Sequence, residues 1–128
     1  MNLLNHLAIQ IQEQSPEKVI LTMPISEKHK QPFGYVHGGI NAVLIETACS
    51  IGANLHVDKQ QFCVGVDLQV SHLSSTQSGT LTVIATPDKI GKTLQVWQAS
   101  VYLDNDKKTA VGRLSLLCQN KTKQTKNE

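Results

Sequence analysis

The sequence predicts an α+β fold in which one long helix lies across a curled antiparallel sheet of about five to six strands. Three observations support this fold class: a single long segment with helical periodicity, several segments with strand periodicity, and short turns between them. Because only one long helix is available to cover the inner face of the sheet, the sheet has to curl around it. The 128 residues, 40% of them hydrophobic, suffice for a single domain, which we expect to span residues 1–119.

A β-hairpin is predicted near the N-terminus. Apolar residues alternate over 7–11 and again over 19–23, where the alternation stops at Pro24. Ser15-Pro16 offers a turn between the two segments. We therefore expect a short helical turn followed by two paired strands. The alternative is one continuous helix with an apolar stripe of Leu3, Leu4, Leu7 and Ile11.

The long helix is predicted over 38–57, after a polar loop at 26–35. Its apolar positions recur at helical spacing, and they are Ile40, Leu44, Thr47, Ile51 and Leu55. A second stripe consists of small residues and one glutamate, and it comprises Gly39, Ala42, Glu46, Cys49, Ser50 and Ala53. Small residues allow the backbone of another element to come close.

The second half of the chain is predicted to supply most of the sheet. β-branched residues and alternation dominate four segments, at 62–73, 80–86, 94–103 and 109–118. Turn residues separate these segments, at Ser78-Gly79, 89–91 and 104–106. Short connections of this kind join antiparallel neighbours, so we expect each strand to pair with the next along the chain.

Charge and hydropathy exclude several classes of protein. The formal net charge is +2, with lysines gathered near the C-terminus, which does not favour a nucleic-acid partner. The N-terminal segment lacks the features of a secretion signal, and no apolar stretch approaches the length of a membrane span. We therefore expect a cytoplasmic protein that does not bind membranes. Residues 120–128 lack apolar partners and are predicted to form a disordered tail.

The cysteines and histidines do not predict a metal site. Cys49, Cys63 and Cys118 are odd in number and widely spaced, which argues against both a disulfide framework and a metal site. We interpret them as core thiols in a reducing cytoplasm. The remaining histidines do not combine with cysteines or acidic residues at ligand spacing, so we expect no metal ion.

Glu46 is the only Asp, Glu, Lys or Arg between His37 and Asp58. Burying a lone carboxylate costs several kcal/mol unless it has a partner or a function. This residue is therefore a candidate for the chemistry, while the alternative is that it faces solvent or forms a salt bridge at an interface. Ser50 lies one helical turn further on, within reach of a hydrogen bond to the carboxylate.

His37-Gly38-Gly39 opens the predicted helix. The first amides of a helix have no partner within it, and the positive end of the dipole lies there, so this segment can stabilise a developing oxyanion. The alternative is a flexible helix entry with His37 as a cap. A basic turn that contains Lys89, Gly91 and Lys92 can meet phosphates, although exposed turns of this kind are usually only solvated.

Three segments resemble the signature of the hotdog-fold thioesterases of the phenylacetate-degradation and aromatic acyl-coenzyme A type, and they are Gln31-Pro32-Phe33-Gly34, Val36-His37-Gly38-Gly39 and the run from Glu46 to Ser50. Within this family the chain is most similar to the 1,4-dihydroxy-2-naphthoyl-CoA hydrolases of menaquinone synthesis, over about residues 7–118. The resemblance implies a hotdog fold, hydrolysis of acyl-CoA to a free acid and CoA, and no cofactor.

The resemblance also implies roles for individual residues. Glu46 attacks the thioester carbonyl or activates a water for that attack, while Ser50 supports it. The Gly38 amide polarises the carbonyl, and Gln31 and His37 orient the thioester or the water. The CoA moiety is expected near Gly65, His72, Leu73, Ser74, Ser75, Lys89, Ile90, Gly91, Lys92 and Thr93. Relatives often carry an arginine after the position of His72, where this chain has serines, so Lys89 or Lys92 is expected to meet the nucleotide phosphate.

Helix geometry predicts that two subunits share the active site. Gly38 and Glu46 are eight residues apart, which is roughly 12 Å along one helix, whereas both must lie ~3 Å from one thioester. Two helices packed antiparallel through the small-residue stripe would bring the two groups together. The resemblance implies the same homodimer, often paired further into a homotetramer.

Two competing functions on the same fold fit less well. A hydroxyacyl dehydratase would need a proline-rich segment around its histidine, which this chain lacks. A non-catalytic acyl-CoA sensor would be expected to carry an additional DNA-binding segment and would not need Glu46.

Overall fold

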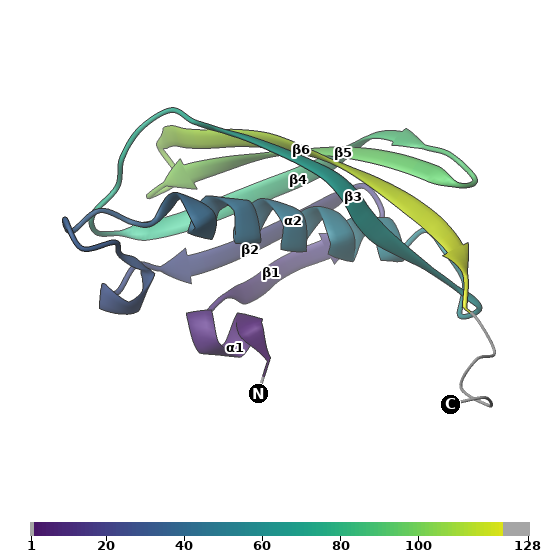
Figure 1. Ribbon diagram of the computed structural model, residues 1–128, viewed down its shortest axis with the longest axis horizontal. Helices are drawn as coiled ribbons and strands as arrows, with labels where there is room; N and C mark the ends of the chain where they lie inside the picture. Colours follow the sequence, from purple (N-terminus) through teal and green to yellow (C-terminus); the bar gives the residue numbers. More distant parts are fainter. Residues whose placement is uncertain (1, 122–128) are drawn as a thin grey trace.

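The computed structural model describes residues 2–121, and these form one long helix against a curved antiparallel sheet, as predicted (Figure 1). The helix α2 (Gly38–Asn54) lies across one face of the sheet. The other helical elements are short, α1 (Leu3–Leu7) and the 3-10 turn η1 (Glu27–His29). The strands are β1 (Gln10–Ser15), β2 (Lys18–Pro24), β3 (Gln61–His72), β4 (Thr80–Ile90), β5 (Leu94–Leu103) and β6 (Lys107–Asn120).

The N-terminal hairpin is confirmed, and the continuous helix is excluded. Helix α1 ends at Ala8, whose φ of 61° lies in the left-handed region, and Ile9 then donates its N–H to Leu4 at 2.9 Å. Strands β1 and β2 pair antiparallel around the Ser15-Pro16 turn. The short helix and the hairpin therefore follow each other as the local pattern predicts.

The prediction that each strand pairs with the next is wrong for β3. The strand order is β1-β2-β4-β5-β6-β3, so β3 lies at an edge and pairs with β6 rather than with β4. Ser78-Gly79 does form a turn, in which Gly79 has a φ of 110°, but a turn fixes the local direction of the chain and not the partner of the strand that precedes it. The segment 73–79 carries the chain across to β4, close to the start of α2 (Figure 1).

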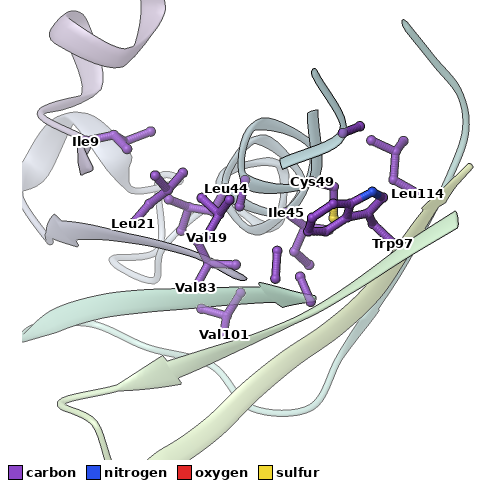
Figure 2. Packing of buried hydrophobic residues seen from close by; sticks show 14 of the residues in the cluster. Ile9, Val19, Leu21, Leu44, Ile45, Cys49, Val83, Trp97, Val101 and Leu114 are labelled. Carbon is purple, nitrogen blue, oxygen red and sulfur yellow. The ribbon is translucent and has the colours of Figure 1, made fainter. Parts of the chain in front are cut away.

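The core lies between α2 and the concave face of the sheet (Figure 2). The helix contributes a broad buried face made of Ile40, Asn41, Leu44, Ile45, Ala48, Cys49, Gly52 and Ala53. The predicted assignment of the helix faces is therefore partly wrong. Cys49 and Ala53 belong to the small-residue stripe but face the sheet, and Leu55 belongs to the apolar stripe but is exposed. The helix is apolar or small-sided nearly all round, so periodicity alone cannot decide which face is buried.

The opposite face of α2 is only partly covered. Gly39 and Glu46 are exposed there, and Ala42 and Ser50 are half-buried. Their spacing of three and four residues places these four side chains on one stripe. Of the predicted small-residue stripe, these four residues therefore lie on the face of α2 that the sheet does not cover.

Cys63 and Cys118 form a disulfide, so the interpretation of all three cysteines as core thiols is wrong for this pair. They lie opposite each other in the β3–β6 register, with their Cα atoms 4.0 Å apart. Their sequence separation is 55 residues, and only the long-range pairing of the two strands brings them together. Cys49 remains a buried free thiol.

The end of the described chain differs slightly from the prediction. Strand β6 continues to Asn120, one residue beyond the expected domain end, and Lys121 donates its N–H to Gln60 at 2.7 Å. The rest of the predicted tail, 122–128, lies outside the described residues. Within 2–121, no helix is long and apolar enough to span a membrane.

Gly52 lies where α2 crosses the indole of Trp97. A Cβ on Gly52 would overlap the six-membered ring of this tryptophan, which is completely buried. We expect Gly52→Ala to lower the free energy of unfolding by about 3 kcal/mol through overpacking, although a glycine-to-alanine change inside a helix usually stabilises by about 1 kcal/mol. Denaturant unfolding measures the change.

Trp97→Phe supplies the control for this prediction. The smaller ring leaves room for the new methyl group, so the double variant should lose less stability than the sum of the two single variants. A Gly52→Ala protein as stable as the wild type would contradict the packing of α2 on Trp97.

Candidate functional site

A pocket of about 420 Å³ lies at the start of α2. The loop before the helix, the first turn of the helix and the segment that follows β3 form its walls. Its lining residues are Gln31, Tyr35, Val36, Gly38, Asn41, His72, Leu73, Ser74, Ser75 and Thr76. The pocket therefore brings Gln31 and Gly38 together with the segment 72–75, whose residues are expected to contact CoA.

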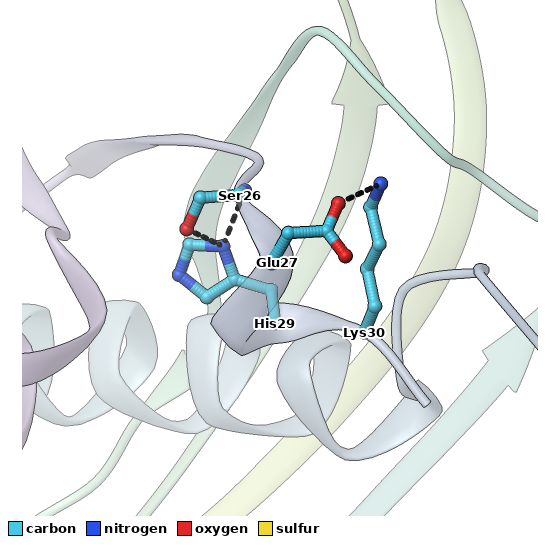
Figure 3. A network of polar contacts seen from close by, with 4 residues as sticks. All are labelled: Ser26, Glu27, His29 and Lys30. Atoms are coloured by element: carbon cyan, nitrogen blue, oxygen red, sulfur yellow. Dashed lines mark hydrogen bonds and ion pairs between the residues drawn. The ribbon is translucent and has the colours of Figure 1, made fainter. Parts of the chain in front are cut away.

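The buried His29 anchors the chain that leads to this pocket. Its Nδ1 accepts the N–H of Ser26 at 2.9 Å (Figure 3), and its Nε2 lies 2.7 Å from the carbonyl oxygen of Leu7. Its own carbonyl oxygen accepts the N–H of His37 at 2.9 Å. This role is not predictable from the sequence, because a histidine within a polar loop carries no signal of burial.

Gln31 lies in a tight loop that fixes its side chain. Its N–H donates to the carbonyl oxygen of Tyr35 at 2.8 Å, and its side-chain Oε1 accepts the N–H of Phe33. Because Oε1 is occupied, the Nε2 hydrogens are the groups of this side chain that can donate to a molecule in the pocket. The side chain can thus orient a carbonyl oxygen or a water.

His37 caps α2. Its Nδ1 accepts the N–H of Gly39 at 2.8 Å, and its ring is otherwise exposed. The Gly38 N–H is among the first amides of the helix, which have no partner within it and lie at the positive end of the dipole. The cap therefore fixes the helix start, and Gly38 at this start lines the pocket.

Glu46 is exposed in the single chain, so the expectation that packing would bury it does not hold for an isolated subunit. Its carboxylate lies against β3 at Gly65, where a Cβ would come within 3.0 Å of Oε2. Gly65 is therefore a place where the absence of a side chain gives the carboxylate room. Burial, and secondarily the charge of Glu46, raise the pKa of the Cys49 thiol to about 12.

The other predicted site residues fall into separate places. Ser50 is half-buried one turn beyond Glu46, and no hydrogen bond between the two is found among the described residues. Gly65 lies beside Glu46 rather than in the pocket. The segment 89–93 forms the end of the β4–β5 hairpin, at the end of the sheet opposite the start of α2 (Figure 1), where Thr93 accepts the N–H of Cys118 at 2.8 Å.

Within one chain, the candidate catalytic groups are thus divided. The helix-start donors lie in the pocket, the carboxylate lies in the middle of α2, and the basic turn lies at the far end of the sheet. Next to the carboxylate, β3 is an edge strand on which Val64 and Val66 are exposed. No group of three or more His, Cys, Asp or Glu side chains in residues 2–121 is arranged to hold a metal ion.

Comparisons with known proteins identify relatives of this chain in sequence and in fold. The model of the thioesterase superfamily matches residues 33–110, more than half of the chain. A 1,4-dihydroxy-2-naphthoyl-CoA hydrolase from Listeria monocytogenes is 33% identical over 96% of this chain and 100% of its own length. A thioesterase structure from Haemophilus influenzae shares 35% identity and a TM-score of 0.87, covering 91% of this chain and 82% of that one. A Staphylococcus aureus protein, solved as a glutamate-to-alanine variant, shares 31% identity and a TM-score of 0.91 over 94% and 100%.

Proposed function

Because the chain belongs to the thioesterase superfamily, we propose that it hydrolyses the thioester of an aromatic acyl-CoA. The fold is that of the hotdog thioesterases, and the chain is a thioester hydrolase. The observation that carries the choice of site is the pocket at the start of α2, which joins Gln31 and Gly38 to the end of β3. The substrate and the roles of the residues are our proposal.

The reaction needs a base or nucleophile, donors for the oxyanion, and a water. Glu46 attacks the thioester carbonyl or removes a proton from the attacking water, while the carbonyl oxygen accepts a hydrogen bond from the Gly38 N–H. If Glu46 attacks, the C–S bond breaks to leave an anhydride between the acyl group and Glu46, and water then hydrolyses this anhydride to the free acid and restores the carboxylate. If Glu46 acts as a base, the oxygen of water adds to the carbonyl directly and the C–S bond breaks. In both routes the thiolate leaves as CoA and takes up a proton. The Nε2 hydrogens of Gln31 orient the carbonyl or the water, and His37 holds the start of the helix.

A complete site requires a second copy of the chain. The Gly38 amide and the Glu46 carboxylate are roughly 12 Å apart along one helix axis, too far to meet the same thioester. If two α2 helices lie antiparallel through the stripe of Gly39, Ala42 and Glu46, the start of one approaches the middle of the other. The open edge of β3 offers unpaired backbone groups that a second β3 can satisfy. We therefore take the catalytic unit to be a homodimer, two of which form a tetramer.

The proposed substrate is an aromatic acyl-CoA such as 1,4-dihydroxy-2-naphthoyl-CoA. Tyr35 lines the pocket and is 42% exposed, so its ring presents apolar surface to a flat acyl group. The 33% identical Listeria relative carries the name of that hydrolase. The phosphates of CoA meet Lys89 or Lys92 of the second copy, because within one chain these exposed lysines lie at the end of the sheet opposite the pocket.

The test is a hydrolysis screen that follows free thiol release from aromatic and aliphatic acyl-CoA substrates, including benzoyl-CoA, 1,4-dihydroxy-2-naphthoyl-CoA, hexanoyl-CoA and palmitoyl-CoA. We expect kcat/KM for the best aromatic substrate to exceed that for the aliphatic ones by at least ~10-fold. A preference for the aliphatic chains would contradict the aromatic assignment. The absence of thiol release from every substrate would contradict the proposed function itself.

A further inference from the structure

Asn41 is a buried amide that points into the pocket at the start of α2. It is 8% exposed, and its Nδ2 lies 3.1 Å from Nδ1 of His72 at the end of β3. A buried amide within a helix is costly unless it is hydrogen-bonded. None of the roles proposed above uses this contact, which joins the first turn of the helix to the edge strand.

The contact defines the protonation of His72. With the amide oriented so that Nδ2 faces the ring, Asn41 donates, because Nδ2 carries hydrogens and has no lone pair available as an acceptor, and Nδ1 of the imidazole is the acceptor. In the neutral ring the proton then resides on Nε2. Asn41 therefore selects one of the two tautomers of His72.

The Nε2 side of this ring lies against the start of α2. A Cβ on Gly38 would be 3.0 Å from both Cε1 and Nε2 of His72, so the imidazole packs directly on Gly38, and both residues line the pocket. The Nε2–H of His72 and the Gly38 N–H, one of the free amides at the helix start, thus belong to two residues in contact at this pocket. A single backbone donor is commonly supplemented by a second donor where an oxyanion develops.

Building on the proposed thioesterase reaction, we infer that His72 donates its Nε2–H to the thioester carbonyl oxygen and that Asn41 is the positioning residue that holds His72 in this tautomer. The proton stays on Nε2 throughout, so the bond strengthens as negative charge develops and no proton transfer is involved. This role differs from a simple packing contact with CoA, which would affect KM and would not depend on the tautomer of the ring.

The first test reads the tautomer directly by ¹⁵N NMR of the histidine rings, with His72→Gln used to assign the signals. We expect the wild-type ring of His72 to be protonated at Nε2. Asn41→Asp has nearly the same shape but offers only acceptors, so it should shift the proton to Nδ1. Asn5→Asp, an exposed site on α1, introduces the same charge away from the pocket and should leave the His72 signals unchanged. A wild-type ring protonated at Nδ1 would overturn the inference.

The second test measures kcat and KM of variants at His72 and Asn41. We expect His72→Leu to lower kcat about 100-fold and Asn41→Asp to lower it about 30-fold, with KM changing less than about 3-fold in each case. His72→Gln keeps an N–H donor and should retain kcat within about 10-fold of the wild type. Thermal unfolding checks that each variant folds.

A double-variant cycle shows whether Asn41 acts through His72. Asn41→Leu should lower kcat when His72 is present, but it should have no further effect on kcat in a His72→Leu background. Additive losses, or an unchanged kcat in Asn41→Asp, would overturn the inference while leaving the thioesterase activity of the wild type intact. A wild-type chain without any acyl-CoA hydrolysis would instead overturn the proposed function, and the NMR result would still decide whether Asn41 sets the tautomer.

Discussion

Replacing Glu46 with alanine is expected to lower kcat at least ~1000-fold while KM and the thermal unfolding temperature stay close to those of the wild type. The carboxylate acts mainly in the transition state, so its loss affects the chemical step more than substrate binding. Because Glu46 is exposed in the single chain and has no hydrogen-bond partner among the described residues, its removal leaves no buried group unsatisfied. Steady-state hydrolysis of the best acyl-CoA measures the effect.

Two further variants test whether the loss of activity is due to the negative charge at this position. Glu46→Gln keeps the shape of the side chain without its negative charge and should be nearly as inactive as the alanine variant. Glu13→Ala removes an exposed carboxylate from β1, far from the pocket, and should hydrolyse the substrate at the wild-type rate. A Glu46→Ala enzyme that retains more than about a tenth of the wild-type kcat would show that another group performs the chemistry.

Local patterns in the sequence were sufficient to predict the elements of the fold. The period of two gave the strands, the period of 3.6 gave α2, and the turn residues gave the hairpins β1–β2, β4–β5 and β5–β6. The pairing of β3 with β6 was not predictable in this way, because strand order depends on contacts between distant segments. The Cys63–Cys118 disulfide was missed for the same reason.

The candidate site was predictable where a residue type is unusual for its surroundings. Glu46 stands out as a lone carboxylate on an apolar helix, and His37-Gly38-Gly39 stands out as a helix start. The buried His29 and the Asn41–His72 contact carry no such local signal, because each depends on a segment that is distant in the sequence. Similarly, the position of 89–93 at the far end of the sheet follows from the length and direction of β4, which the sequence predicted four residues too short at its C-terminal end.

Dimers that contain one chain of each of two inactive variants are expected to regain hydrolysis activity. One chain carries Glu46→Ala, and the other carries both Gln31→Ala and His37→Ala, so each variant lacks a different part of the site. In a mixed dimer with shared sites, one site receives all the lesions and the other receives none. Random pairing makes about half of the dimers mixed, so about a quarter of the wild-type activity should return.

The measurement that tests the shared site most directly is therefore the hydrolysis rate after the two variants are unfolded and refolded together. Each variant refolded alone and the wild type treated in the same way provide the reference rates. Circular dichroism checks that the helix content is kept after loss of the His37 cap. Native mass spectrometry measures the fraction of mixed dimers. A site shared between two subunits predicts about a quarter of the wild-type rate, far above that of either parent. A mixture that contains mixed dimers but is no more active than its separate parents would contradict it, because the whole site would then lie within one chain.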